Sequence, residues 1–114
     1  MIVDILQAAN IPAKESRWPD PPPVTYAIYF DAVSTDAPDR VSGVAIAPRI
    51  YTHDVTVELY EPTADPTAEA SVESALDAAG MVWDKQDRYW LADVQRYQVI
   101  YEFSYTEKRR RYHG

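Results

Sequence analysis

The chain has 114 residues, which is the usual size of one domain and too few for two domains with separate cores. It contains no cysteine, which excludes disulfides and thiolate zinc sites, and its formal net charge of -7 disfavours binding to phosphate backbones. No apolar stretch approaches the ~20 residues of a membrane helix, and the N-terminus lacks the basic start of a signal peptide, so we expect a cytoplasmic protein with no membrane partner.

The N-terminal segment is expected to form one short amphipathic helix. Apolar residues recur at i, i+3, i+4 and i+7 over residues 2–9, and Asn10 followed by Ile11-Pro12 ends the pattern. The proline-rich stretch 12–23 then excludes regular structure and favours an extended lead-in.

Residues 24–30 and 51–61 both carry the period-2 alternation of strands. Between them, residues 34–39 have the composition of a turn, and their flanks are only modestly strand-like. We therefore expect residues 31–49 to form a long protruding hairpin or loop, although its apolar residues could instead complete the subunit's own sheet. The candidate assembly residues of this region are Ser34, Asp36, Asp39, Arg40, Val41, Val44, Ile46 and Arg49.

A second helix is expected at residues 66–79. Asp65 is a good N-cap, Pro66 suits the first helical position, and Gly80 suits the C-terminal cap. The spacing of the apolar residues predicts one buried stripe, with the acidic residues outside. The stripe is Ala68, Val72, Ala75, Leu76 and Ala79, and the outward residues are Glu69, Glu73 and Asp77.

Two short strands, at residues 81–83 and 89–91, are expected to form a hairpin around a polar turn, and residues 97–105 a closing strand. The fold class is α+β, with a mainly antiparallel or mixed sheet of four to five strands and both helices on one face. We expect a single domain over residues 1–106 and a basic, disordered tail over 107–114. The candidate partner contacts of this tail are Lys108, Arg109, Arg110 and Arg111.

The sequence contains no constellation typical of an enzyme, a metal site or a cofactor site. Asp54 and Glu58 share a strand face, but a separation of roughly 13 Å is too great for a carboxylate pair. His53, expected on the core side, and His113 have no second ligand at metal-binding spacing. With three glycines, a glycine-rich phosphate loop is also excluded. We predict a protein that is not an enzyme and needs no cofactor.

Aromatic residues are concentrated in the C-terminal part of the chain. They could form a platform on which nucleic-acid bases stack, but a row of this spacing on a strand is more often the core face of the sheet. The core interpretation is therefore favoured. The residues are Trp83, Trp90, Tyr97, Tyr101, Phe103 and Tyr105.

Several stretches in order resemble the small tail-completion, or tail-terminator, proteins of siphophages and prophages. The resemblance covers about residues 2–105 and rests on joint order and spacing, since no single motif is diagnostic. The chain departs from the family at Ala37-Pro38-Asp39, where the family often has Asn, and in the Arg109-Arg110-Arg111 extension. The matching stretches are Pro21-Pro22-Pro23 leading into residues 24–30, then Ser34-Thr35-Asp36, Val57-Glu58-Leu59-Tyr60, Asp65-Pro66 with Glu69, Val72, Glu73 and Leu76, and residues 97–103.

This resemblance implies a structural virion protein that forms a ring, expected to be a hexamer, on the tail tube. The ring would stop tail polymerisation and provide the surface on which the head docks. Implied partners are further copies of the chain, the major tail protein and a head-closure or connector protein, with DNA passing only as cargo. The implied location is the host cytoplasm and then the virion neck. Alternatives are another neck component, such as a head-closure or adaptor subunit, or a small monomeric peptide- or oligonucleotide-binding module.

Overall fold

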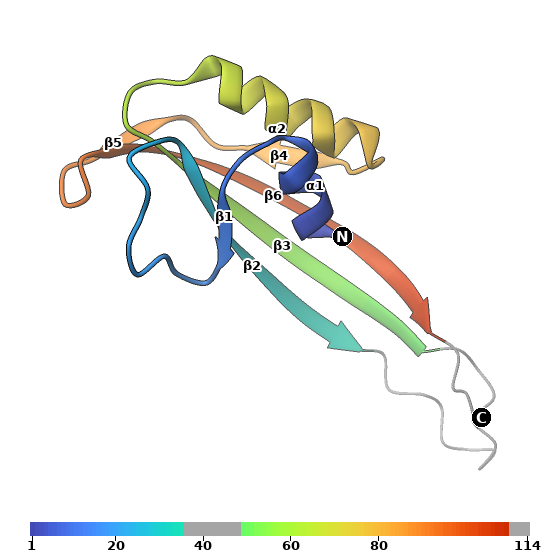
Figure 1. Ribbon diagram of the computed structural model, residues 1–114. Helices are drawn as coiled ribbons and strands as arrows, with labels where there is room; N and C mark the ends of the chain where they lie inside the picture. The colour runs from blue at the N-terminus through green and yellow to red at the C-terminus, as the bar shows by residue number, and fades with distance from the viewer. Residues whose placement is uncertain (36–48, 110–114) are drawn as a thin grey trace, which may run out of the picture.

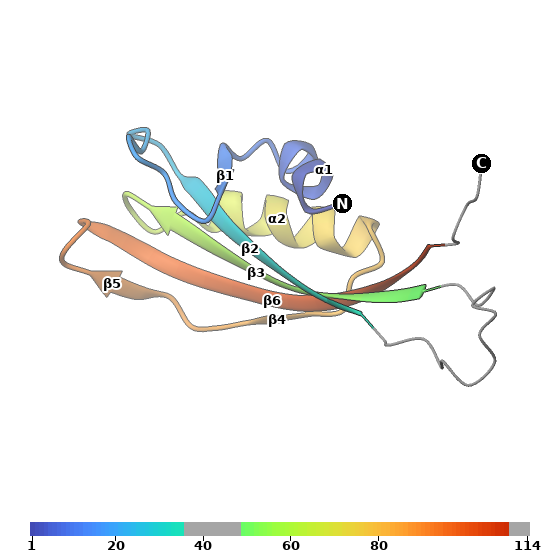
Figure 2. The same cartoon turned by 90° about the horizontal axis from the view of Figure 1, so that it is seen from below.

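The computed structural model describes residues 1–35 and 49–109, which form an α+β domain (Figure 1). Two helices lie on the same face of a six-stranded mixed sheet, as the view along the sheet in Figure 2 shows. The strand order is β1-β2-β3-β6-β4, and β5 also pairs with β6. The elements are α1 (Ile2–Ala8), β1 (Ala13–Glu15), β2 (Tyr26–Thr35), β3 (Arg49–Glu61), α2 (Pro66–Ala78), β4 (Trp83–Lys85), β5 (Tyr89–Leu91) and β6 (Arg96–Arg109).

The sheet has more strands than the four to five expected, partly because the proline-rich lead-in contains β1. This strand pairs in parallel with Ala27–Tyr29 of β2. Proline lacks an N–H donor but keeps its carbonyl acceptor, and the Pro12 carbonyl accepts a hydrogen bond from Ala27 N at 2.8 Å. The prolines therefore flank the added strand without interrupting it.

The expected hairpin between the two short strands is wrong. β4 and β5 do not pair with each other, because both pair antiparallel with β6. Lys85 lies opposite Tyr101, and Tyr89 lies opposite Gln98, so three residues (86–88) face only two residues of β6. The segment is therefore one edge strand interrupted by a bulge of one extra residue.

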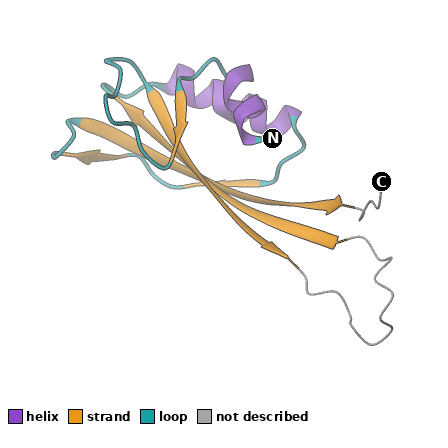
Figure 3. Cartoon of the chain, turned by 60° about the horizontal axis from the view of Figure 1, so that its bottom comes forward, coloured by secondary structure: helices purple, strands orange, loops and turns teal. Residues whose placement is uncertain are grey.

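β2, β3 and β6 are longer than predicted. β2 extends through Thr35, β3 begins at Arg49, and β6 continues to Arg109, three residues beyond the expected domain end at 106. Their far ends project past both helices as a three-stranded arm, clearly seen in Figure 3. The arm consists of residues 30–35, 49–56 and 104–109.

The core lies between the helices and the near half of the sheet. Alternate residues of β3 and β6, such as Val57, Leu59 and Val99, point to the helix side and are fully buried. Leu6 of α1 and Leu76 of α2 cover them, while the Asp65 side chain caps α2 by accepting from Ala68 N at 3.1 Å. In the part of the chain that is described, neither helix is long and apolar enough to cross a membrane.

Leu76→Asp tests the placement of α2 against the sheet. The substitution would put an unpaired charge at a fully buried position, so we expect a loss of roughly 4 kcal/mol or more in the free energy of unfolding. Denaturant unfolding measures it. The exposed neighbour Ser74→Asp is the control, and equal stability of the two variants would contradict the observed helix face.

Candidate functional site

His53 is buried, as the strand pattern predicted, at the base of the arm. The residue is 6% exposed, and Nδ1 lies 3.0 Å from both carboxylate oxygens of Asp31. The ring stacks on Tyr105 with centroids 4.4 Å apart. Among the described residues, no group of three or more His, Asp or Glu side chains has the arrangement of a metal site.

The aromatic row mostly belongs to the core, so that interpretation is confirmed for its central members. Tyr101 and Phe103 are buried against the helices. Trp90 is 45% exposed and meets Tyr97 edge-on with centroids 4.9 Å apart, at the β5–β6 end of the sheet. The row does not form one open stacking surface.

Most of the candidate assembly residues lie outside the described part of the chain. Ser34 is exposed in β2 and Lys108 is exposed in β6, while Arg49 and Arg109 are the first residue of β3 and the last of β6. The candidates outside the described residues are Asp36, Asp39, Arg40, Val41, Val44, Ile46, Arg110 and Arg111.

The arm has two outer edges with no partner strand among the described residues. β1 pairs with β2 only as far as Tyr29, and β4 pairs with β6 only as far as Phe103. Residues 30–35 of β2 and 104–109 of β6 therefore present six-residue strand edges on opposite sides of the arm. Edges of this kind are templates for pairing with another strand.

The backbone groups that these edges offer follow from the alternation of a β-strand. Ala27 N and Tyr29 O bond to the β1 side, so in β2 the odd-numbered residues, including Val33, direct N–H and C=O outward. Ile100 O accepts from Gln86 N on the β4 side, so in β6 the even-numbered residues, including Thr106, do the same. Both edges thus direct backbone donors and acceptors outward, where no strand of the described residues pairs with them.

The β2 edge carries exposed apolar side chains that favour pairing with another strand. Phe30 is 39% exposed and Val33 is 50% exposed, on opposite faces of the strand. No proline occurs in either edge, so neither carries that common protection against strand pairing. The β2 edge contains one charged residue, Asp31, and the β6 edge contains three, Glu107, Lys108 and Arg109.

A charge cluster built around two buried carboxyls lies at the other end of the sheet and was missed by sequence reasoning. Glu61 of β3 is 0% exposed, and its Oε1 accepts from Arg88 Nε at 3.1 Å. Glu69 of α2, expected on the outer face, is also buried, and its carboxylate binds Lys85 Nζ at 2.9 Å as well as Arg88. The position of Glu61, two residues after Leu59 on an inward-facing strand side, was the available signal.

The bulge at 86–88 makes this cluster possible. In a regular strand, residues three apart point to opposite faces, so Lys85 and Arg88 could not reach the same carboxylate. The extra residue shifts the alternation by one, and both cations then point to the helix side. Glu73 of α2 completes the cluster, since it binds Lys85 Nζ at 2.7 Å and accepts from Tyr101 Oη at 2.7 Å.

The surroundings drive the two buried carboxyls in opposite directions. Burial, followed by hydrogen bonding to Glu69, raises the pKa of Glu61 to about 7. Burial also opposes ionisation of Glu69, but hydrogen bonds with Glu61, Lys85 and Arg88 outweigh it and lower the pKa of Glu69 to about 2. The cluster therefore favours one ionised and one protonated carboxyl.

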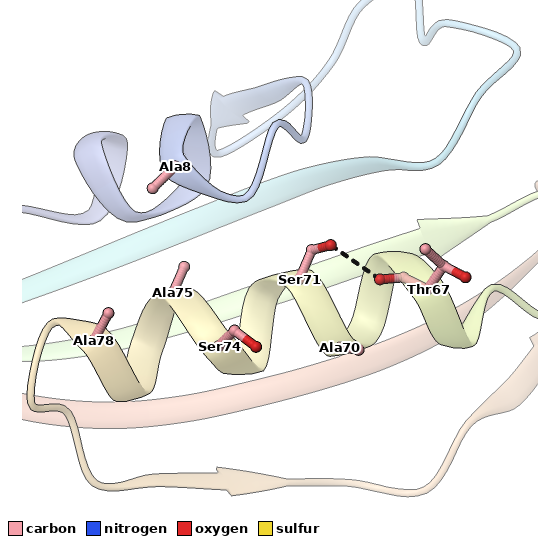
Figure 4. A pocket seen from close by; sticks show the side chains of 7 residues that line it. All are labelled: Ala8, Thr67, Ala70, Ser71, Ser74, Ala75 and Ala78. Atoms are coloured by element: carbon pink, nitrogen blue, oxygen red, sulfur yellow. Dashed lines mark hydrogen bonds between the residues drawn. The ribbon is translucent and has the colours of Figure 1, made fainter.

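A shallow groove between α1 and the outer face of α2 contains no ionisable side chain (Figure 4). The Ser71 hydroxyl, which lines it, donates to the Thr67 carbonyl at 3.0 Å. The groove therefore offers little chemistry. Its lining is Ala8, Thr67, Ala70, Ser71, Ser74, Ala75 and Ala78.

No protein-family model matches this chain, and no curated protein sequence matches it either.

Arg88→Met tests the contribution of the cluster to stability. The change keeps the apolar stem but removes a cation from two buried carboxyls, so we expect a loss of roughly 1–2 kcal/mol, reduced by the partial exposure of Arg88. Urea unfolding of Arg88→Met is compared with that of Arg17→Met, an exposed control. If the two variants are equally stable, the Arg88 guanidinium makes no net contribution to the stability of the fold.

Proposed function

We propose that this protein is the tail-completion subunit of a long-tailed phage, which forms a ring on the end of the tail tube. The ring ends tube growth and receives the head. The resemblance in sequence supports this proposal, and so does the arm, whose two strand edges have no partner strand among residues 1–35 and 49–109.

The two edges lie on opposite sides of one arm, so the contact they favour is head-to-tail. Contacts between two different surfaces generate closed rings when the rotation closes, and filaments when it does not. Pairing the β2 edge of one subunit with the β6 edge of the next would satisfy the outward donors and acceptors and cover Phe30 and Val33.

The charge of the chain also suits this role. DNA must slide through such a ring without being held, and the formal net charge of -7 makes the subunit repel phosphate backbones. The partners would be further copies of the chain, the major tail protein and the connector of the head. Association must await the tube, so the subunit is expected to be monomeric when dilute and annular when concentrated.

Proline substitutions test the strand edges without disturbing the fold. Val33→Pro and Thr106→Pro each delete one outward N–H, which the subunit's own ladder does not use. We expect each variant to keep its melting temperature within a few degrees and to lose concentration-dependent assembly, measured by light scattering. Val33→Thr and Thr106→Val are the controls, because they retain the N–H. Normal assembly by both proline variants would place the contact elsewhere.

The second test is binding to tail tubes. We expect the protein to appear by negative-stain microscopy as a cap at one end of tubes made from the major tail protein of the same virus, and to stop their elongation. Binding to isolated head connectors but not to tubes would instead identify a head-closure or adaptor subunit. A stable dimer at every concentration would contradict a ring.

A further inference from the structure

The buried cluster contains more acidic groups than basic ones. The groups that face its centre are Glu61 from β3, Glu69 and Glu73 from α2, Lys85 from β4, Arg88 from the bulge and Tyr101 from β6. Three ionised carboxylates against two cations would leave one negative charge uncompensated. Such a charge is costly on Glu61 or Glu69, whose side chains are buried, while the two cations and Glu73 keep part of their contact with water.

The contacts show which carboxyl is least suited to carry that charge. Both oxygens of Glu69 are bound, Oε1 to Lys85 and Oε2 to Arg88. Oε1 of Glu61 accepts from Asp65 N at 3.2 Å and from Arg88 Nε. Oε2 of Glu61 is buried and receives no hydrogen bond from the described residues. A carboxylate oxygen in this position lacks both solvent and donor. The hydrogen bond between Glu61 and Glu69 that contributes to the raised pKa of Glu61 therefore requires a proton on one of the two carboxyls.

We propose that the folded protein binds one proton on Oε2 of Glu61 in mildly acidic solution, so that this carboxyl is a neutral member of the cluster. The proton balances the charges, because Glu69 and Glu73 then face Lys85 and Arg88. The site is created by folding, since the unfolded chain exposes Glu61 to water. Folding therefore takes up a proton at this position.

The direction of the linked pH effect follows from the two carboxyls. The raised pKa of Glu61 means that the folded state binds more protons than the unfolded state between pH 4.5 and about 7, so stability falls as pH rises through this range. The lowered pKa of Glu69 adds stability as pH rises from about 2 to 4.5. Stability contributed by this pair is therefore greatest near pH 4.5 to 5.

The local consequence concerns residues 83–91. This edge segment is joined to α2 and β3 through Lys85 and Arg88, while most of its side chains are exposed. Loss of the proton places a second negative charge beside Glu69 and favours hydration of Glu61. Hydration requires the segment to move, so its amides should exchange faster at pH 8 than at pH 6 after correction for intrinsic rates.

Glu61→Gln removes the titration but keeps the shape of the side chain, because the amide is uncharged at every pH and, like a protonated carboxyl, can both donate and accept a hydrogen bond. We expect the folding equilibrium constant of the wild type, relative to Glu61→Gln, to fall tenfold to a hundredfold between pH 5 and pH 8. Glu15→Gln, at an exposed position, should follow the wild-type profile. Parallel profiles for wild type and Glu61→Gln would overturn the proposal.

Carboxyl ¹³C NMR of the wild type gives an answer even if Glu61→Gln fails to fold. We expect the Glu61 carboxyl to titrate above the other glutamates and the Glu69 carboxyl below them. Titration of Glu61 in the ordinary glutamate range would overturn the proposal. Neither experiment requires assembly, so the result stands apart from the proposed tail function.

Discussion

A mismatch in length between helices and strands determines the shape of this protein. α2 has 13 residues and spans about 20 Å, whereas β3 also has 13 residues and spans roughly 43 Å. The helices can therefore cover only about half of the long strands. The core forms over the covered half, and the remainder becomes the arm, whose outer edges have no partner strand in the described part of the chain.

The covered half in turn depends on how its outer edge is closed. The bulged segment 83–91 completes the sheet beside β6, and the ion pairs of Lys85 and Arg88 connect it to α2 and β3. Because ion pairs hold this segment, its attachment depends on the protonation state of the carboxyls, whereas attachment by apolar packing would not depend on pH. The two ends of the sheet thus differ in chemistry. At one end the edge segment 83–91 is held by ionisable side chains, and at the other end the arm presents backbone groups that no described strand pairs with.

The sequence predicted the parts of the fold that follow from periodicity. The alternation in β3 and β6 and the stripe around Leu76 identified the strands, the main helix and the core. β1 was missed because the prolines on either side of its three residues indicate irregular structure, and only the tertiary pairing with β2 makes these residues a strand. Glu69 was misplaced because an acidic residue beside an apolar stripe is usually solvated, and only the cations on a distant strand explain its burial. The assembly residues between positions 36 and 48 lie outside the described residues.

The bulge also restricts how this gene can change in length. Insertions and deletions are usually tolerated between short strands, where they only lengthen or shorten a turn. Here, loss of residue 86 or 87 would remove the bulge and leave Lys85 and Arg88 two positions apart in a regular strand, with both side chains still on the helix face, whereas loss of both residues would make the two cations neighbours on opposite faces. Related chains should therefore keep the two cations either three residues apart with the bulge or two residues apart without it, and should vary more freely in the residues between them.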